Sequence, residues 1–234
     1  MKSITNISDR IIIYSVEAAR FSYKMMETSF SDLQKLLSTI EDDTLTNDIA
    51  LYVFKYAWQF IDMSFRFGRM LAQIRRLKHK EVGFKSVEKA LVDIEKARNY
   101  IQHLNSQIPK VSKEIYPILG AVSWASKDKQ KSFTIALGAI PTGTSFHSLS
   151  FDTMSKEFIS DIILNIDTFS VNLTECNKLM CSGFEYLIDW IDKNGYSSTK
   201  DIEPNIAIVP ALNFDAPSKR YLRVKFDFNK GQEK

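Results

Sequence analysis

Residues 8–40 read SDRIIIYSVEAARFSYKMMETSFSDLQKLLSTI, and this stretch decides the fold. Its apolar side chains recur every three or four residues, the spacing of one face of an α-helix. The members of this stripe are Ile12, Val16, Ala19, Tyr23, Met26, Phe30, Leu33, Leu36, Leu37 and Ile40. Ser8 can cap the first turn, and the acidic cluster at 41–43 breaks the pattern and suits the start of a following helix. We therefore predict a long amphipathic helix at the beginning of a helical first half.

The same spacing continues in two further segments. One runs over about 48–79 and carries positive charge in its last turn, and Gly83, shortly after it, can terminate the helix. The other begins at Ser86, a good N-cap, and runs over 86–108 until Pro109 limits it. The first half is therefore predicted to consist of three long helices.

Beyond residue 116 the pattern changes to short apolar runs separated by turns. Segments 119–125, 132–139 and 145–150 are typical of strands in a small meander. Segment 161–167 is apolar and β-branched, and it is predicted as one more strand. These runs define a β-rich insertion at about 117–168.

The rest of the chain returns to a helix and ends with a strand. Asn172 and Glu175 stand at the spacing of a capping box and open a helix that Gly195 ends. Residues 220–228 alternate between apolar and charged side chains, as a half-buried strand does. The predicted fold is mainly α: one domain over 1–234, a helical bundle with a small β-meander insertion and a C-terminal strand, α+β overall.

Composition narrows the classes of protein further. Eight glycines and six prolines in 234 residues are about half the average usage of each, which favours long helices. No apolar run approaches the roughly 18 residues of a membrane span, and the first residues lack the apolar region of a signal peptide. We expect a cytoplasmic protein with no membrane partner. The net charge of +3 neither demands nor forbids nucleic acid.

Several familiar chemistries are missing from the sequence. Cys176 and Cys181 are five residues apart on a predicted helix, so they point about 140° apart, and buried inert thiols fit them better than a disulfide or a zinc site. The three histidines are scattered, so we expect no metal. The glycines are too dispersed for a phosphate-cradling loop and no nucleophile elbow is present. We expect no cofactor.

One stretch, KARNYIQH at 96–103, carries chemical content. Arg98 lies about 60° from the centre of the apolar stripe of its predicted helix, where a cation needs a partner, a route to solvent or a function. Asn99 and His103 form an i, i+4 pair on the opposite flank. Two interpretations remain open: Arg98 pairs with a carboxylate of a neighbouring helix while His103 is a surface residue, or these residues form a site.

The string Arg98-Asn99-x-x-x-His103, late on a helix of a helical core, resembles the Arg-x4–6-His motif of the HEPN superfamily, in which the residue after the arginine is often Asn. The resemblance covers roughly residues 8–194, and its specificity lies in those six positions. It implies a bundle of four or five helices, a homodimer that joins two motifs in a composite site at the two-fold, and often metal-independent endoribonuclease activity. It also implies a role in toxin–antitoxin, abortive-infection or other antiviral defence, with an antitoxin or regulator as a further partner.

The chemistry implied by this resemblance assigns a role to each residue. His103 would act as general acid or base, and Arg98 would hold phosphate oxygens through two hydrogen bonds. Asn99 would orient His103 or the phosphate. The 2′-OH of the RNA would attack, leaving a 2′,3′-cyclic phosphate, so DNA would be inert. Some HEPN toxins carry a tyrosine two residues after the histidine, as the target of an adenylylating antitoxin; Asn105 stands there instead.

A basic run precedes this motif. Arg75, Arg76, Lys78 and Lys80 would track an RNA backbone, although a solvated helix end explains the same charges. Three functions therefore stay open: a HEPN-like endoribonuclease with RNA as substrate, a HEPN-like module that binds nucleotide or RNA without catalysis, and a helical protein-interaction domain in which Arg98 is only ion-paired.

Overall fold

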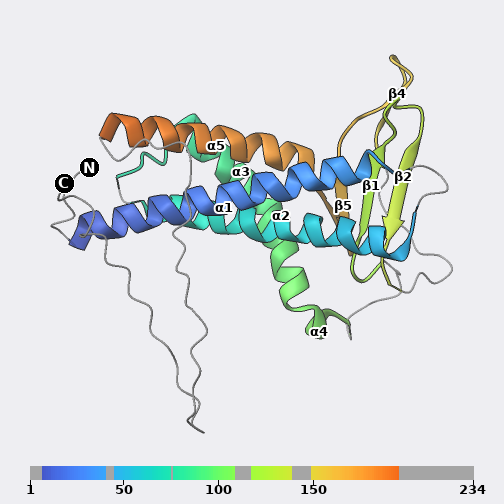
Figure 1. Ribbon diagram of the computed structural model, residues 1–234, viewed down its shortest axis with the longest axis horizontal. Coiled ribbons are helices and arrows are strands. Elements are labelled where there is room, and N and C mark those ends of the chain that lie inside the picture. The colour runs from blue at the N-terminus through green and yellow to red at the C-terminus, as the bar shows by residue number, and fades with distance from the viewer. Residues whose placement is uncertain (1–6, 41–44, 75, 109–116, 139–148, 195–234) are drawn as a thin grey trace, which may run out of the picture. The chain divides into compact units, whose positions relative to one another are not determined.

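The computed structural model describes residues 7–40, 45–74, 76–108, 117–138 and 149–194. This part of the chain is mainly helical and carries a small antiparallel sheet (Figure 1). None of the helices described is long and apolar enough to cross a membrane. The helices are α1 (Ile7–Leu37), α2 (Asn47–Gln73), α3 (Val82–Gln102), the short α4 (Leu104–Gln107) and α5 (Leu173–Asn194).

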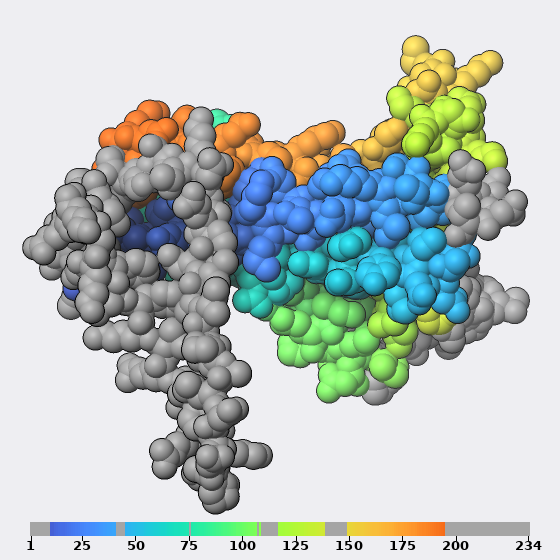
Figure 2. All heavy atoms as spheres, in the orientation of Figure 1, coloured from blue at the N-terminus to red at the C-terminus, as the bar shows by residue number. Residues whose placement is uncertain are grey.

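The four long helices form a bundle. Helix α1 packs along α2, α2 packs on α3, and α3 packs on α5. In Figure 1 the axes of α1, α2 and α5 are nearly parallel, and α1 runs in the opposite direction to α2 and α5. On the face shown in Figure 2, α1 and α2 lie side by side along most of their length. The apolar stripe predicted on α1 is buried almost throughout, from Ile12 to Leu37, so the periodicity of 8–40 identifies the core face correctly.

Side-chain caps define two of the helix starts. The Thr46 hydroxyl accepts a hydrogen bond from the Ile49 amide at 3.3 Å, at the beginning of α2. Asn172 Oδ1 accepts from the Glu175 amide at 2.9 Å, at the beginning of α5. The predicted capping role of Asn172 is confirmed.

The four-stranded sheet has the order β2-β1-β5-β6, with every neighbouring pair antiparallel. Its strands are β1 (Ala121–Ala125), β2 (Ser132–Ala136), β5 (Ile163–Ile166) and β6 (Phe169–Asn172). A separate hairpin pairs β3 (Phe151–Asp152) with β4 (Glu157–Phe158). The β region thus lies between α4 and α5 in the chain.

One face of the sheet belongs to the helical core. Val122 of β1 lies opposite Ile135 of β2 and Leu164 of β5, and all three side chains are buried in the same apolar cluster as Phe60 and Phe67 of α2. Figure 1 shows the sheet at the end of the bundle where α1 ends and where α2 and α5 begin. The sheet therefore closes one end of the core.

Three predicted helix boundaries are wrong. The helix predicted over 86–108 ends at Gln102, and α4 follows as a separate short helix after His103. The helix predicted over 48–79 ends at Gln73, because Ile74 takes an extended backbone and both Ile74 and Leu77 turn into the core. The next helix begins at Val82, one turn before Ser86, whose hydroxyl donates back to the Val82 carbonyl at 3.0 Å inside the helix. Gly83, predicted as a helix end, lies in the first turn of α3.

The strand predictions are only partly correct. Strands appear within 119–125, 132–139 and 161–167, each shorter than predicted, while 149–150 is not a strand and 145–148 lies outside the described residues. β3, β4 and β6 were not predicted, and β6 extends the β region past residue 168 to Asn172. Gly195 and the strand predicted at 220–228 also lie outside the described residues.

Candidate functional site

Arg98 is held by two groups of α2. Its Nε donates to Oδ1 of Asp62 at 3.0 Å, and its guanidinium carbon lies 4.2 Å from the centre of the Phe65 ring. The side chain is only 20 % exposed. An ion pair and a cation–π contact therefore fix the guanidinium at the edge of the core. This is the helix-to-helix carboxylate partner that one of the two sequence interpretations requires.

Asp62 serves two arginines at once. Its Oδ2 accepts from Arg66 Nε at 2.8 Å, one turn along α2, while Oδ1 accepts from Arg98. Burial alone would raise the pKa of the Asp62 carboxyl, but the hydrogen bonds from Arg66 and Arg98 outweigh it and lower this pKa below its usual value. The carboxylate is thus a charged clamp between α2 and α3.

The Phe65 ring contacts two guanidinium groups. Arg69 sits 5.1 Å from the ring centre and pairs with Glu95 of α3, while Arg98 covers the same ring at 4.2 Å. The contacts of Asp62 and Phe65 with Arg98 were not predicted from the sequence. The i, i+4 spacing of Asp62 and Arg66 was visible there, but the face of α2 that meets Arg98 depends on how the helices cross.

Asn99 and His103 lie at the exposed end of α3. His103 is the residue directly after the helix, with φ −109° and ψ 23°, and its amide donates to the Asn99 carbonyl at 3.1 Å. Both side chains are exposed, and neither forms a hydrogen bond or ion pair with the part of the chain that the structure describes. They remain accessible to an external ligand.

The structure does not join Arg98 to His103 within one chain. Arg98 is bound to α2, whereas His103 lies beyond the last turn of α3, and no bond links the two side chains among the described residues. A helix places residues five apart about 140° from each other. A site that used both groups on one phosphate would need a ligand between them or a second copy of the chain.

The predicted RNA-binding residues occupy the connection between α2 and α3. Arg76, Lys78 and Lys80 are exposed there, so Arg76 and Lys78 lie outside the helical turn predicted for them. Arg75 lies outside the described residues. The backbone of this connection is tied to α5: Trp190 Nε1 donates to the Arg76 carbonyl at 3.3 Å, and the Tyr186 hydroxyl lies 3.0 Å from both the amide and the carbonyl of Lys78.

This basic connection and His103 lie at opposite ends of α3. The helix has 21 residues, which correspond to a length of about 30 Å. The two sets of predicted residues are therefore not brought together into one small site. Only a ligand long enough to follow α3 could contact both.

The cysteines take no part in a cross-link. Both are free thiols, and burial raises the pKa of Cys176 to about 12, in agreement with an inert buried thiol. Cys181 is only half-buried and accepts a hydrogen bond from the Tyr23 hydroxyl at 3.3 Å. Among the residues that the structure describes, no three His, Cys, Asp or Glu side chains gather as a metal site would require.

Removal of the Asp62 carboxylate is expected to destabilise the fold measurably. Asp62→Ala leaves Arg98 without its partner near the core, so the free energy of unfolding should fall by about 1–2 kcal/mol. Urea unfolding followed by circular dichroism measures this change. Glu27→Ala is the matched control, because the Glu27–Lys24 pair on α1 is more exposed, at 46 % and 65 %, and its loss should cost at most about 0.5 kcal/mol. Equal losses in the two variants would contradict the clamp.

The stabilisation that the Asp62 carboxylate provides is expected to depend on pH. Because the Asp62 pKa is lower in the folded than in the unfolded protein, its stabilisation is complete above the unfolded value of about 3.9 and is lost as the pH falls toward the folded value. The difference in unfolding free energy between wild type and Asp62→Ala should therefore be larger at pH 7 than at pH 3. An unchanged difference would contradict the assignment.

Comparison with models of known protein families, with curated proteins and with solved structures gives no match for this chain.

Proposed function

We propose that this chain is a HEPN-like, metal-independent endoribonuclease that cleaves RNA through the 2′-OH, with Arg98, Asn99 and His103 as its active residues. It would serve in toxin–antitoxin or antiviral defence. One observation carries the proposal most directly: a guanidinium is fixed in place at the end of α3 where two unbonded polar side chains, Asn99 and His103, are exposed.

The fixed guanidinium suits a phosphate. Only Nε of Arg98 is hydrogen-bonded, to Asp62, so among the described residues both terminal nitrogens lack a partner. Two parallel N–H groups match two phosphate oxygens. Contact with Phe65 restricts the rotamers of the side chain, which lowers the entropy that it would lose on binding. Arg98 would thus stabilise the negative charge that develops on the phosphorus.

His103 would supply the proton transfer. Imidazole groups exchange protons near neutral pH and so can act as general base toward the 2′-OH or as general acid toward the leaving oxygen. Asn99, one turn earlier on α3, would donate a hydrogen bond to the phosphate or to His103. Because Arg98 and His103 leave the helix in different directions, we propose a homodimer in which each phosphate meets Arg98 of one copy and His103 of the other.

The proposed RNA path follows α3. Arg76, Lys78 and Lys80 would contact the backbone at the beginning of the helix, about 30 Å from His103. This separation predicts that short oligonucleotides are poor substrates. An antitoxin or other regulator would restrain the activity in the cell.

The proposal is tested with end-labelled RNA in EDTA. Purified protein is expected to cut the RNA and to leave 2′,3′-cyclic phosphate ends, while the same sequence with 2′-deoxyribose at every position stays intact. Absence of cleavage over a range of RNA sequences and lengths would rule out the endoribonuclease. Cleavage of the deoxy substrate would rule out the 2′-OH mechanism.

The Asp62–Arg98 pair also favours a second candidate, a helical interaction domain in which Arg98 only clamps α2 to α3. The same preparation separates the candidates. RNA binding without cleavage, weakening steeply as salt rises, would indicate a non-catalytic binding module. A protein that neither binds nor cuts RNA would indicate the interaction domain.

A further inference from the structure

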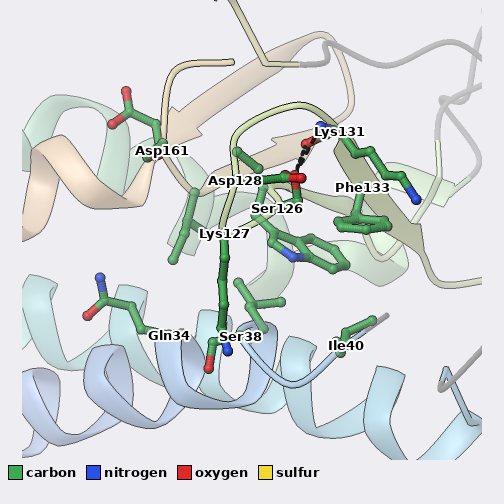
Figure 3. Close-up of a pocket in the computed structure, with 14 residues that line it drawn as sticks. Gln34, Ser38, Ile40, Ser126, Lys127, Asp128, Lys131, Phe133 and Asp161 are labelled. Atoms are coloured by element: carbon green, nitrogen blue, oxygen red, sulfur yellow. Dashed lines mark hydrogen bonds between the residues drawn. The ribbon is translucent and has the colours of Figure 1, made fainter. Parts of the chain in front are cut away.

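A cavity of about 690 Å³ lies away from Arg98, between the last turn of α1 and the β1–β2 hairpin. Figure 3 shows Gln34 and Ser38 on the helix side and Lys127, Lys131 and Phe133 on the hairpin side. Its volume falls within the range of about 300–1,000 Å³ that is usual for small-molecule sites. The functions considered above make no use of it.

One wall of the cavity is aromatic. Trp124 of β1 and Phe133 of β2 are paired across the strands with ring centres 5.4 Å apart and planes inclined by 30°. Trp124 is 5 % exposed, and the half-buried Phe133 completes the wall. Leu37 and Ile40 at the end of α1 add buried aliphatic surface. Such a wall accepts the face of a planar ring.

The polar groups that line the cavity differ in whether they are already hydrogen-bonded within the protein. The carboxylate of Asp128 accepts hydrogen bonds from the Ser126 hydroxyl and the Gln130 amide, and that of Asp161 accepts from Asn172 Nδ2 at 2.7 Å. In contrast, the Lys127 ammonium and the Gln34 carboxamide form no hydrogen bond or ion pair with the described residues. In Figure 3 the Lys127 side chain runs from the hairpin toward Ser38. The cavity thus retains an uncommitted cation and an uncommitted amide beside its aromatic wall.

We propose that this cavity binds a small planar anion, an aromatic ring that carries one carboxylate or phosphate. The ring lies against Phe133 and Trp124, the anion pairs with Lys127, and the Gln34 amide donates a hydrogen bond to the anion or to the ring. The formal negative charges of Asp128 and Asp161 are balanced by the positive charges of Lys127 and Lys131 in the same lining. The proposal does not depend on ribonuclease activity.

Isothermal titration of the full chain with two matched pairs of probes tests this site. AMP is compared with adenosine, and 4-hydroxybenzoate with 4-hydroxybenzamide, so that each pair differs in its anionic group. We expect at least one anion to bind with a Kd between about 10 µM and 1 mM, and its uncharged analogue to bind about tenfold more weakly. The pair that shows this difference identifies phosphate or carboxylate as the anion. No binding of any probe at 10 mM, or equal binding of anions and uncharged analogues, would overturn the proposal.

Variants of the cavity then locate the bound anion. Lys127→Ala should raise the Kd of the anion about tenfold, and Phe133→Leu should raise it by about three- to tenfold through loss of ring contact. Lys35→Ala is the matched control. Lys35 lies on the last turn of α1, is 75 % exposed and does not line the cavity. The Kd of the anion for this variant should therefore equal the wild-type value. Lys127 is exposed, so its replacement should leave the circular dichroism spectrum unchanged. Wild-type affinity in Lys127→Ala would overturn the assignment.

Discussion

Replacement of His103 by alanine is expected to lower the rate of RNA cleavage by about 10²- to 10⁴-fold, which is the usual contribution of a general acid or base. The side chain is exposed and makes no bond within the described residues, so its loss should not disturb the fold. Single-turnover cleavage of labelled RNA in EDTA measures the effect. Unfolding by urea should give the same midpoint for wild type and His103→Ala. A lower rate of cleavage would then reflect the loss of the imidazole and not a loss of stability.

Asn105→Ala is the matched control for this experiment. Asn105 is exposed on α4, two residues after His103, and our mechanism gives it no role, so its rate should match that of the wild type. A loss of rate in Asn105→Ala equal to that in His103→Ala would show that the end of α3 acts through its shape rather than through an imidazole. An undiminished rate in His103→Ala would remove His103 from the mechanism.

The variant Arg98→Lys distinguishes a catalytic role of Arg98 from a purely structural one. Arg98→Lys keeps a positive charge that can still pair with Asp62 but loses the planar pair of terminal nitrogens. If the guanidinium holds a phosphate, this variant should lose most of its cleavage while retaining most of its stability. If Arg98 only clamps α2 to α3, cleavage and unfolding free energy should stay close to wild type together.

The helices were predictable where one face is buried along its whole length. On α1 the helical period and the burial agree almost throughout from Ile12 to Leu37. The end of α2 was not predictable in this way, because Ile74 and Leu77 fit the helical period and yet enter the core from a turn. Local spacing does not distinguish these arrangements, since both bury the same two side chains.

The strand β6 shows a second limit of local patterns. It follows β5 through a turn at Asp167, which takes a positive φ of 47°. Tight hairpins of this kind usually carry Asn-Gly or Asp-Gly, and here the sequence is Asp167-Thr168. The usual turn signal was therefore absent, and the four residues of β6 were too few to be identified by alternation alone.

In the candidate site, too, the residues close together in sequence were predictable, whereas contacts between residues far apart in sequence were not. Its motif residues are close in sequence and were readily identified. The partner of Arg98, Asp62, is 36 residues away, and the cavity beside Lys127 combines α1 with β1 and β2. Both depend on helix crossing and sheet placement, which the spacing of residues within one element does not specify.

Replacement of Gly183 by alanine is expected to destabilise the protein by about 1–3 kcal/mol, or to lower its Tm by roughly 2–12 °C. Gly183 of α5 faces α3 so closely that an added Cβ would lie 2.0 Å from Val87 Cγ2. The β-branched Val87 is stiff in a helix, so it cannot easily rotate away and the helices must separate. The expected loss is the net change, after the gain of about 1 kcal/mol that alanine brings to a helix is taken into account.

Gly68→Ala is the matched control for this prediction. Its Cβ would meet the Leu91 side chain at 2.7 Å, but this contact is with the far end of a flexible, half-buried side chain that can change rotamer. The unfolding free energy should therefore stay within about 1 kcal/mol of wild type, because the gain in helix propensity offsets the adjustment. Equal losses at Gly68 and Gly183 would show that any added methyl group is costly in this bundle.

A double replacement tests whether Val87 is the specific obstacle at Gly183. Val87→Ala alone should cost about 1–2 kcal/mol, because it leaves a small cavity in the core. Since the alanine methyl at 183 would occupy that cavity, Gly183→Ala with Val87→Ala should lose less stability than the sum of the two single changes, by at least about 1 kcal/mol. Additive losses would mean that the close approach of α3 and α5 is set elsewhere. Gly83 is the other candidate, because a Cβ there would lie 2.4 Å from the Cβ of Tyr186.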